Sequence, residues 1–250
     1  GRQGAGQPAL HHRRCGSLDL CSCDHRVRMR MLVTDYQLDG EEELGRGHFL
    51  RLRRVHLRNR YEDGSLSAPY FCELVDRPHH GTDAVVVGLW RRSADSQTVE
   101  VLLRQGLRPA LRFGRDPARV AVADKAPYLL LYEVVAGILE DEDHGIEGIK
   151  RRAVAEAWEE AGVRLEEADI EPLGERVFPT PGMAPEAFFL VCAEVRKEPE
   201  TPMGDGSPME HGAKLRWLPI EDALRLCDSG EVEDAKTEIL LHRLQRRLNT

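Results

Sequence analysis

The strongest constraint on this 250-residue chain is a helical repeat of small and apolar residues across residues 147–161. Four of them recur on one face of such a helix: Ile149, Ala153, Ala157 and Ala161. Gly162 follows, a residue suited to the left-handed position that ends a helix. Strand-like stretches stand on both sides of this segment. The sequence therefore predicts one central helix enclosed by strands, a mixed α/β (α+β) sandwich.

The remaining elements follow from apolar periodicity and turn residues. Strands are expected at Asp83–Trp90, Val99–Leu103, Tyr128–Ala136, Asp169–Phe178, Ala187–Val195 and Leu215–Leu218. Residues 104–119 are expected to form a basic loop, and helices are expected at Ile220–Ser229 and Asp234–Leu248. Four adjacent acids, residues 140–143, predict a solvated loop, because buried carboxylates need partners.

Before this core, short alternating stretches over residues 32–80 predict a small antiparallel β meander. Residues 1–31 are rich in arginine and lack apolar periodicity, which predicts a disordered tail. The expected organisation is a tail over 1–31, a meander over 32–80 and a main domain over 81–250. Cysteines and histidines of the tail could hold zinc, but their spacing matches no common zinc finger.

Composition narrows the function. A formal net charge of −8 argues against nucleic acid as the main partner, because phosphate backbones need a basic footprint. No apolar run approaches the roughly 18 residues of a membrane span, so no membrane partner is expected. Three cysteines, Cys72, Cys192 and Cys227, stand alone in apolar contexts and indicate a reducing compartment, the cytoplasm.

Three carboxylates of the central helix carry the chemistry. Glu156 and Glu160 are one turn apart and project from one face, and Glu159 lies beside them. Like charges at this spacing repel, and a hard divalent cation reverses the sign of that interaction. Oxygen ligands suit Mg²⁺ or Mn²⁺, so the helix is a candidate metal site. An exposed acidic helix face is the alternative.

The segment from Gly137 through Glu147 to Val163 resembles the Nudix box, G-x5-E-x7-R-E-U-x-E-E-x-G-U, where U is aliphatic. Similarity to ADP-ribose and nucleotide-sugar pyrophosphatases extends over about residues 70–245. The segments that carry it are Val101–Pro109, Glu133–Gly137, Phe178–Gly182 followed by Glu186, and Ser229–Lys236.

The resemblance implies a Nudix-type α/β/α sandwich that hydrolyses the pyrophosphate of ADP-ribose or a related nucleotide sugar. Metal ions would be held by Glu156, Glu160, Glu159 and the carbonyl of Ala136. Catalytic roles fall to Glu159 and to a loop acid, with Glu210 preferred over Glu200 and Asp205. Substrate contacts would come from Arg108, or else Arg104, and from Glu133 and Glu186. The resembling enzymes pair through their N-terminal strands, so a homodimer is expected.

Two departures from the box matter. Nine residues separate Gly137 from Glu147 where the motif has five, which indicates an insertion at residues 141–144. Ala155 stands where the motif has an arginine that orients the carboxylates, and Arg152 could replace that arginine in part. Two alternatives therefore stay open: hydrolysis of another nucleoside diphosphate derivative, and a Nudix-fold binding module with weakened catalysis.

Overall fold

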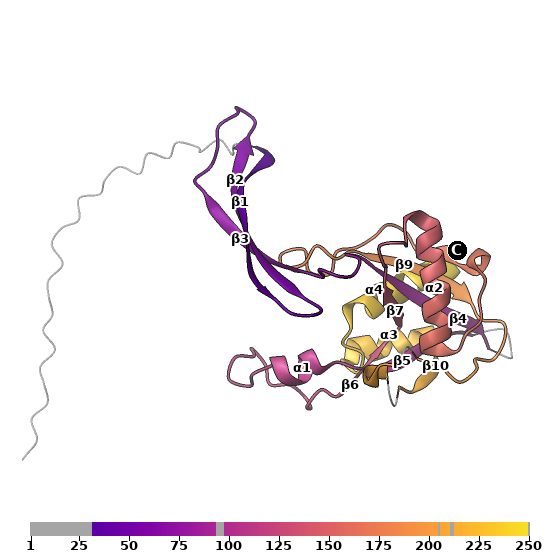
Figure 1. The fold of residues 1–250 in the computed structure, drawn as a ribbon. Coiled ribbons are helices and arrows are strands. Elements are labelled where there is room, and N and C mark those ends of the chain that lie inside the picture. Colours follow the sequence, from indigo (N-terminus) through magenta and orange to yellow (C-terminus); the bar gives the residue numbers. More distant parts are fainter. Residues whose placement is uncertain (1–31, 94–97, 205, 211–212, 250) are drawn as a thin grey trace, which may run out of the picture. The chain divides into compact units, whose positions relative to one another are not determined.

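The computed structural model describes residues 32–93, 98–204, 206–210 and 213–249 (Figure 1). The predictions for residues 1–31 and for Asp205 lie outside the described residues. The chain divides into two compact units. One comprises the described residues up to Gln37 together with Arg58–Ala68, and the other comprises Leu38–Leu57 together with the described residues from Pro69 onward.

The predicted N-terminal meander is a three-stranded sheet in the order β1-β2-β3. Its strands are β1 (Val33–Arg46), β2 (Arg51–Tyr61) and β3 (Tyr70–Asp76). The β2 and β3 strands are antiparallel, with Val55 opposite Cys72. The sheet falls within residues 32–80, and the boundary at residue 80 stays a prediction.

The main sheet has seven strands and is organised around β4 (Ala84–Arg92). The β4 strand is antiparallel to β5 (Val99–Leu107) and β7 (Val135–Ile138), and parallel to β9 (Phe188–Glu194). The remaining strands are β6 (Leu130–Glu133) and β10 (Leu215–Pro219), both on β5, and β8 (Glu171–Pro172) on β9.

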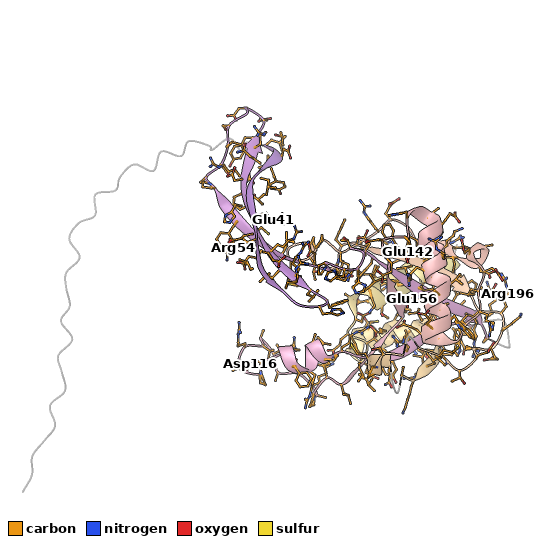
Figure 2. The ribbon with its side chains drawn as sticks, viewed as in Figure 1. Glu41, Arg54, Asp116, Glu142, Glu156 and Arg196 are labelled. Atoms are coloured by element: carbon orange, nitrogen blue, oxygen red, sulfur yellow. The ribbon has the colours of Figure 1, made fainter. Side chains whose placement is uncertain are left out.

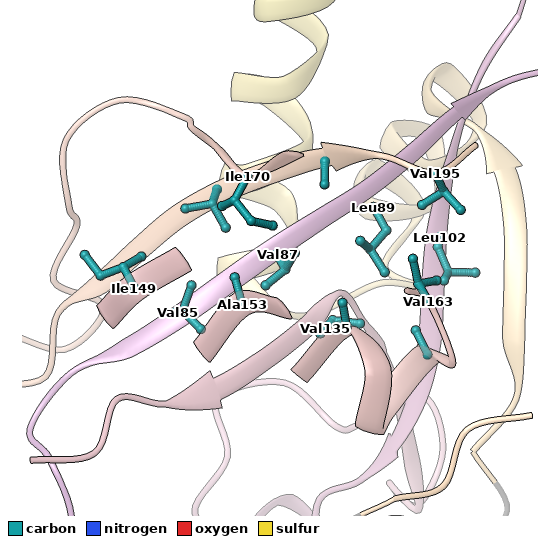
Figure 3. Close-up of a cluster of buried hydrophobic side chains, with 14 of the residues drawn as sticks. Val85, Val87, Leu89, Leu102, Val135, Ile149, Ala153, Val163, Ile170 and Val195 are labelled. Atoms are coloured by element: carbon teal, nitrogen blue, oxygen red, sulfur yellow. The ribbon is translucent and has the colours of Figure 1, made fainter. Parts of the chain in front are cut away.

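Side chains of β4 alternate between two hydrophobic layers because successive residues of a strand point to opposite faces. Val85, Val87 and Leu89 pack with the apolar face of α2 (Gly145–Ala161), as Figure 3 shows for part of this cluster. On the other face, Val86 packs with residues of α3 (Ile220–Ser229) and α4 (Ala235–Leu248). Helices cover both faces of one mixed sheet, so the predicted α/β/α sandwich is confirmed.

The predicted strand Tyr128–Ala136 is in fact two strands, β6 and β7. The β4 and β5 strands pair only from Trp90 to Arg92 and separate beyond Val101. As a result β6 pairs with β5, and β7 pairs with β4. This split places Glu133 opposite Arg104, and Ala136 opposite Val86.

Two other segments differ from their predictions. The expected loop after Leu103 continues β5 to Leu107 and then forms the short helix α1 (Pro109–Gly114). The expected strand Asp169–Phe178 is reduced to η1 (Glu167–Asp169) and the two residues of β8. Pro172 lacks a backbone donor and Gly174 has a φ of 82°, which interrupts the ladder, and pairing resumes only as an isolated bridge between Val177 and Phe188. A second short turn, η2 (Pro208–Glu210), precedes β10. Among the described residues, no helix is long and apolar enough to cross a membrane.

Candidate active site

The central helix α2 carries the three carboxylates predicted to form the site. It begins at Gly145, two residues before the predicted start, and ends with Gly162 at a φ of 64°. Figure 2 labels Glu156 on this helix. The α2 helix packs against β7. Glu156 and Glu160 therefore lie over the strand that contains Ala136 and Gly137.

The carboxylate of Glu160 is buried and fixed at both oxygens. Its Oε2 accepts a hydrogen bond from the backbone nitrogen of Ala136 at 3.0 Å. Its Oε1 accepts from Nη1 of Arg104, which is only 4% exposed. Sequence reasoning placed Arg104 at the substrate, whereas the structure places its guanidinium on a predicted metal ligand.

Glu133 has no exposed surface and lies at the centre of a charge network. Nη2 of Arg108 donates to its two oxygens at 2.6 and 2.7 Å, and Nζ of Lys236 donates at 2.7 Å. Nη1 of Arg104 lies 3.9 Å from its Oε1. Glu133 thus holds three cations in place, and Arg108, whose side chain is 39% exposed, is the member that reaches solvent.

Lys236 is the part of this network that sequence reasoning did not assign a role. Asp234, at the N-cap of α4, accepts from Nζ of Lys236 at 3.0 Å and from Thr237 Oγ1 at 2.6 Å. The Thr237 hydroxyl oxygen in turn accepts from the backbone nitrogen of Val134 at 2.9 Å. The family-like segment Ser229–Lys236 was the only sequence signal for Lys236. Its pairing with Glu133, 103 residues away, has no local signal.

Two strand glycines leave the space that two of these carboxylates occupy. A Cβ added at Gly137 would collide with the carboxylate of Glu156. A Cβ added at Gly106 would collide with the carboxylate of Glu133. Glycine at each position allows an acidic side chain to lie directly against the backbone of the neighbouring strand.

The acidic run before α2 is only partly solvated, so that prediction was wrong for Asp143. This residue is buried and accepts from Nε of Arg152 at 2.9 Å and from Nη2 of Arg151 at 3.3 Å. Burial acts to raise the pKa of Asp143, but hydrogen bonds from Arg152 and the Glu140 backbone outweigh it and lower the pKa. Arg152 was expected to replace the box arginine in part. Its Nη1 lies 4.0 Å from Glu156, which is an ion-pair distance rather than a hydrogen bond.

We expect the substitution Asp143→Asn to lower the free energy of unfolding by about 1–3 kcal/mol at neutral pH, because a charged hydrogen-bond acceptor is lost. The lowered folded-state pKa means that this contribution is fully present above the unfolded-state pKa. It is lost as the pH falls through the folded-state pKa. Urea unfolding of both proteins at a series of pH values would measure it. A difference that persists at strongly acidic pH would contradict the ion-pair account.

The loop that follows β9 is fastened to the end of α2. The backbone nitrogen of Glu200 donates to Gly162 O at 2.9 Å, and that of Gly204 donates to Glu159 O at 2.9 Å. The side chain of Glu200 pairs with Arg164 at 2.6 Å and is exposed. The backbone of Glu210 lies in η2, which packs beside β5. The roles of Glu159 and Glu210 stay predictions.

Glu186 is paired with Arg77 rather than with a member of the network around Glu133. Its Oε1 accepts from Nη1 of Arg77 at 2.7 Å, and it lines a small cavity with Leu50 and Val75. A larger cavity of about 600 Å³ lies at the start of α2, where Ile149 and Phe189 contribute to its wall. Among the side chains that the structure describes, no predicted site residue lines that cavity. The candidate site is therefore the surface near Glu156, Glu160 and Arg108.

The donor set fits a divalent cation by its chemistry. Glu156, Glu159 and Glu160 offer only oxygen, which Mg²⁺ and Mn²⁺ prefer. Each carboxylate oxygen has two lone pairs, so Glu160 has acceptor capacity beyond the bonds from Arg104 and the Ala136 nitrogen. In the part of the chain that the structure describes, no three acidic, histidine or cysteine side chains already converge as a metal cluster.

Comparison with known proteins supports the fold. No family model matches the chain, and no curated protein sequence matches it. A solved structure titled ADP compounds hydrolase is 13% identical with a TM-score of 0.60, covering 87% of this chain and 96% of the other. An Ap4A hydrolase from C. elegans, at 15% identity, covers 66% of this chain and 98% of the other with a TM-score of 0.40. The T. brucei MERS1–RNA complex, at 18% identity, covers 58% of this chain and 54% of the other with a TM-score of 0.40.

A TM-score of 0.40 does not indicate a shared fold with the latter two structures. The first match covers more of the chain than residues 81–250 alone, so part of the N-terminal region shares in the likeness. At such low identity the likeness concerns architecture. The chain has the Nudix hydrolase fold, an α/β/α sandwich with its acidic helix α2 packed on the central sheet.

Proposed function

We propose that this chain hydrolyses the pyrophosphate bond of ADP-ribose or a related nucleoside diphosphate sugar, using Mg²⁺ or Mn²⁺. The products would be a nucleoside monophosphate and a sugar phosphate. The observation that supports this most is the pair Glu156 and Glu160, which lie on one face of α2 with Arg104 on Glu160. The fold shared with a solved ADP compounds hydrolase supports the substrate class.

Each part of the site has a task in this proposal. Glu156 and Glu160, with Glu159 and the carbonyl of Ala136, would hold the cations. Bound cations would neutralise the pyrophosphate and activate the attacking water. Arg108 still has donors beyond those on Glu133 and is partly exposed, which suits it to bind a phosphate or the terminal ribose.

A loop acid would accept the proton of the attacking water. Glu210 is the first candidate, because its backbone lies in η2 beside β5, the strand that carries Arg104. Glu200 is the weaker described candidate, because its carboxylate is already paired with Arg164 on an exposed surface. Glu186 stays a candidate for substrate binding through its position beside Arg77.

A panel assay tests the proposal. The full chain is incubated with Mg²⁺ and ADP-ribose, nucleotide sugars or dinucleoside polyphosphates, and the products are identified. Release of a nucleoside monophosphate from a diphosphate sugar supports the proposal, and preference for another compound selects the alternative substrate. A binding module is the second candidate, favoured by Ala155 in place of the box arginine. Tight binding without any product would support it.

We predict a homodimer in which the N-terminal sheet contributes to the substrate pocket of the partner. That sheet exposes large apolar side chains, such as Leu38 and Phe71, which is typical of a surface that another chain covers. Light scattering should give twice the chain mass. Phe71→Glu should weaken the dimer, whereas Phe113→Glu, at an exposed phenylalanine outside the sheet, should not. A strictly monomeric protein with full activity would contradict the prediction.

A further inference from the structure

The helix α2 lacks an arginine of its own that holds Glu160. Ala155 stands at the position where the Nudix box has its arginine. Arg152 directs its Nε donor to Asp143 at 2.9 Å. Its Nη1 lies 4.0 Å from Glu156, beyond hydrogen-bond distance. The helix itself therefore provides no short directional bond from Arg152 to either carboxylate.

An arginine from the sheet makes that bond instead. Arg104, in β5, donates through Nη1 to Oε1 of Glu160, while the backbone nitrogen of Ala136 donates to Oε2. A carboxylate held at both oxygens has a fixed plane. Its remaining lone pairs therefore point in fixed directions.

Arg104 is itself confined by burial. It is 4% exposed, and its Nη1 lies 3.9 Å from Glu133, an ion pair without a hydrogen bond. Glu133 is anchored by Arg108 and by Lys236 at the start of α4. A continuous series of charges, Lys236–Glu133–Arg104–Glu160, thus connects α4 to α2 across the sheet. A guanidinium confined by burial loses little further freedom when it orients Glu160.

We propose that Arg104 is a positioning residue that orients Glu160 for a divalent cation, replacing the arginine absent at Ala155. This inference rests on the proposed function, because it needs a cation at Glu160. The alternative role for Arg104 is competition with the cation for the Glu160 carboxylate. If Arg104 competed with the cation for Glu160, its removal would tighten metal binding, whereas removal of a positioning residue weakens it.

Binding of Mn²⁺, measured by electron paramagnetic resonance of the free ion, distinguishes weakened from tightened metal binding and so separates the two roles. We expect Arg104→Met to weaken Mn²⁺ binding about 10–100-fold, as supporting residues of metal sites do. Arg104→Lys should fall between, because lysine keeps the charge but not the rigid planar guanidinium. Arg91→Met is the matched control, since Arg91 also pairs with a glutamate on the main sheet, Glu100. It should bind Mn²⁺ like the wild type.

The Mg²⁺ concentration for half-maximal hydrolysis should rise from the wild type through Arg104→Lys to Arg104→Met. The change in kcat at saturating Mg²⁺ should be smaller. If Arg104→Met does not fold, Arg104→Lys decides. Unchanged or tighter Mn²⁺ binding in a folded Arg104 variant would overturn the positioning role while leaving the proposed function standing. A folded wild type that neither binds Mn²⁺ nor hydrolyses any compound would overturn the proposed function, and this inference with it.

Discussion

Replacing Glu160 with glutamine is expected to remove nearly all metal-dependent hydrolysis, by at least about 100-fold. Outer partners of a metal site alone account for about 10–100-fold, and the loss of a direct ligand should exceed that. The amide has one oxygen in place of two, while both Arg104 and the Ala136 nitrogen approach this side chain as donors. One of those donors would then face an NH₂ group, which disturbs the geometry as well as the charge.

Initial rates as a function of Mg²⁺ would measure this effect. Glu238→Gln is a suitable control, because Glu238 is an exposed acid on α4. It removes the same charge from another helix and should keep the wild-type rate. Near-full hydrolysis by Glu160→Gln at saturating Mg²⁺ would remove Glu160 from the site.

The substitution Glu133→Gln should have the largest effect on stability. It leaves Arg108, Lys236 and Arg104 around a neutral side chain that has no access to water. Removing one partner of a buried ion pair costs about 3–5 kcal/mol. In a protein of this size each kcal/mol lowers Tm by roughly 2–4 °C, so we expect a fall of roughly 6–20 °C.

Thermal unfolding followed by circular dichroism would measure that fall. Glu171→Gln provides the comparison, because Glu171 pairs with Arg247 on the surface, where both side chains are 56% exposed. An exposed pair contributes about 1 kcal/mol or less. Equal effects of the two substitutions would mean that Glu133 is not the centre of a buried network.

The elements that could be predicted from the sequence are those with a local signal. The four-residue repeat of α2, the glycine at its end and the apolar run of β4 each follow from neighbouring residues. The split between β6 and β7 could not be predicted in this way. It depends on β4 and β5 separating beyond Val101, which is a property of the whole sheet.

The candidate site shows the same limit at the level of side chains. Helical spacing places Glu156 and Glu160 together, because they belong to one element. Glu160 and Arg104 are 56 residues apart, so their pairing follows from the register of β5 rather than from local sequence. Asp143 was misassigned because a run of acidic residues is usually solvated. Its partners Arg151 and Arg152 lie 8 and 9 residues further along the chain, in α2.

The central claim is that the carboxylates of α2 serve a metal-dependent hydrolysis of a phosphoanhydride. Phosphorus NMR of ADP-ribose with the full chain, first in excess chelator and then in excess Mg²⁺, tests it most directly. The claim predicts an unchanged pyrophosphate signal in chelator. After Mg²⁺ is added, two phosphomonoester signals should replace it. A folded protein that leaves the pyrophosphate signals of ADP-ribose and of the nucleotide sugars intact in Mg²⁺ and in Mn²⁺ would contradict it.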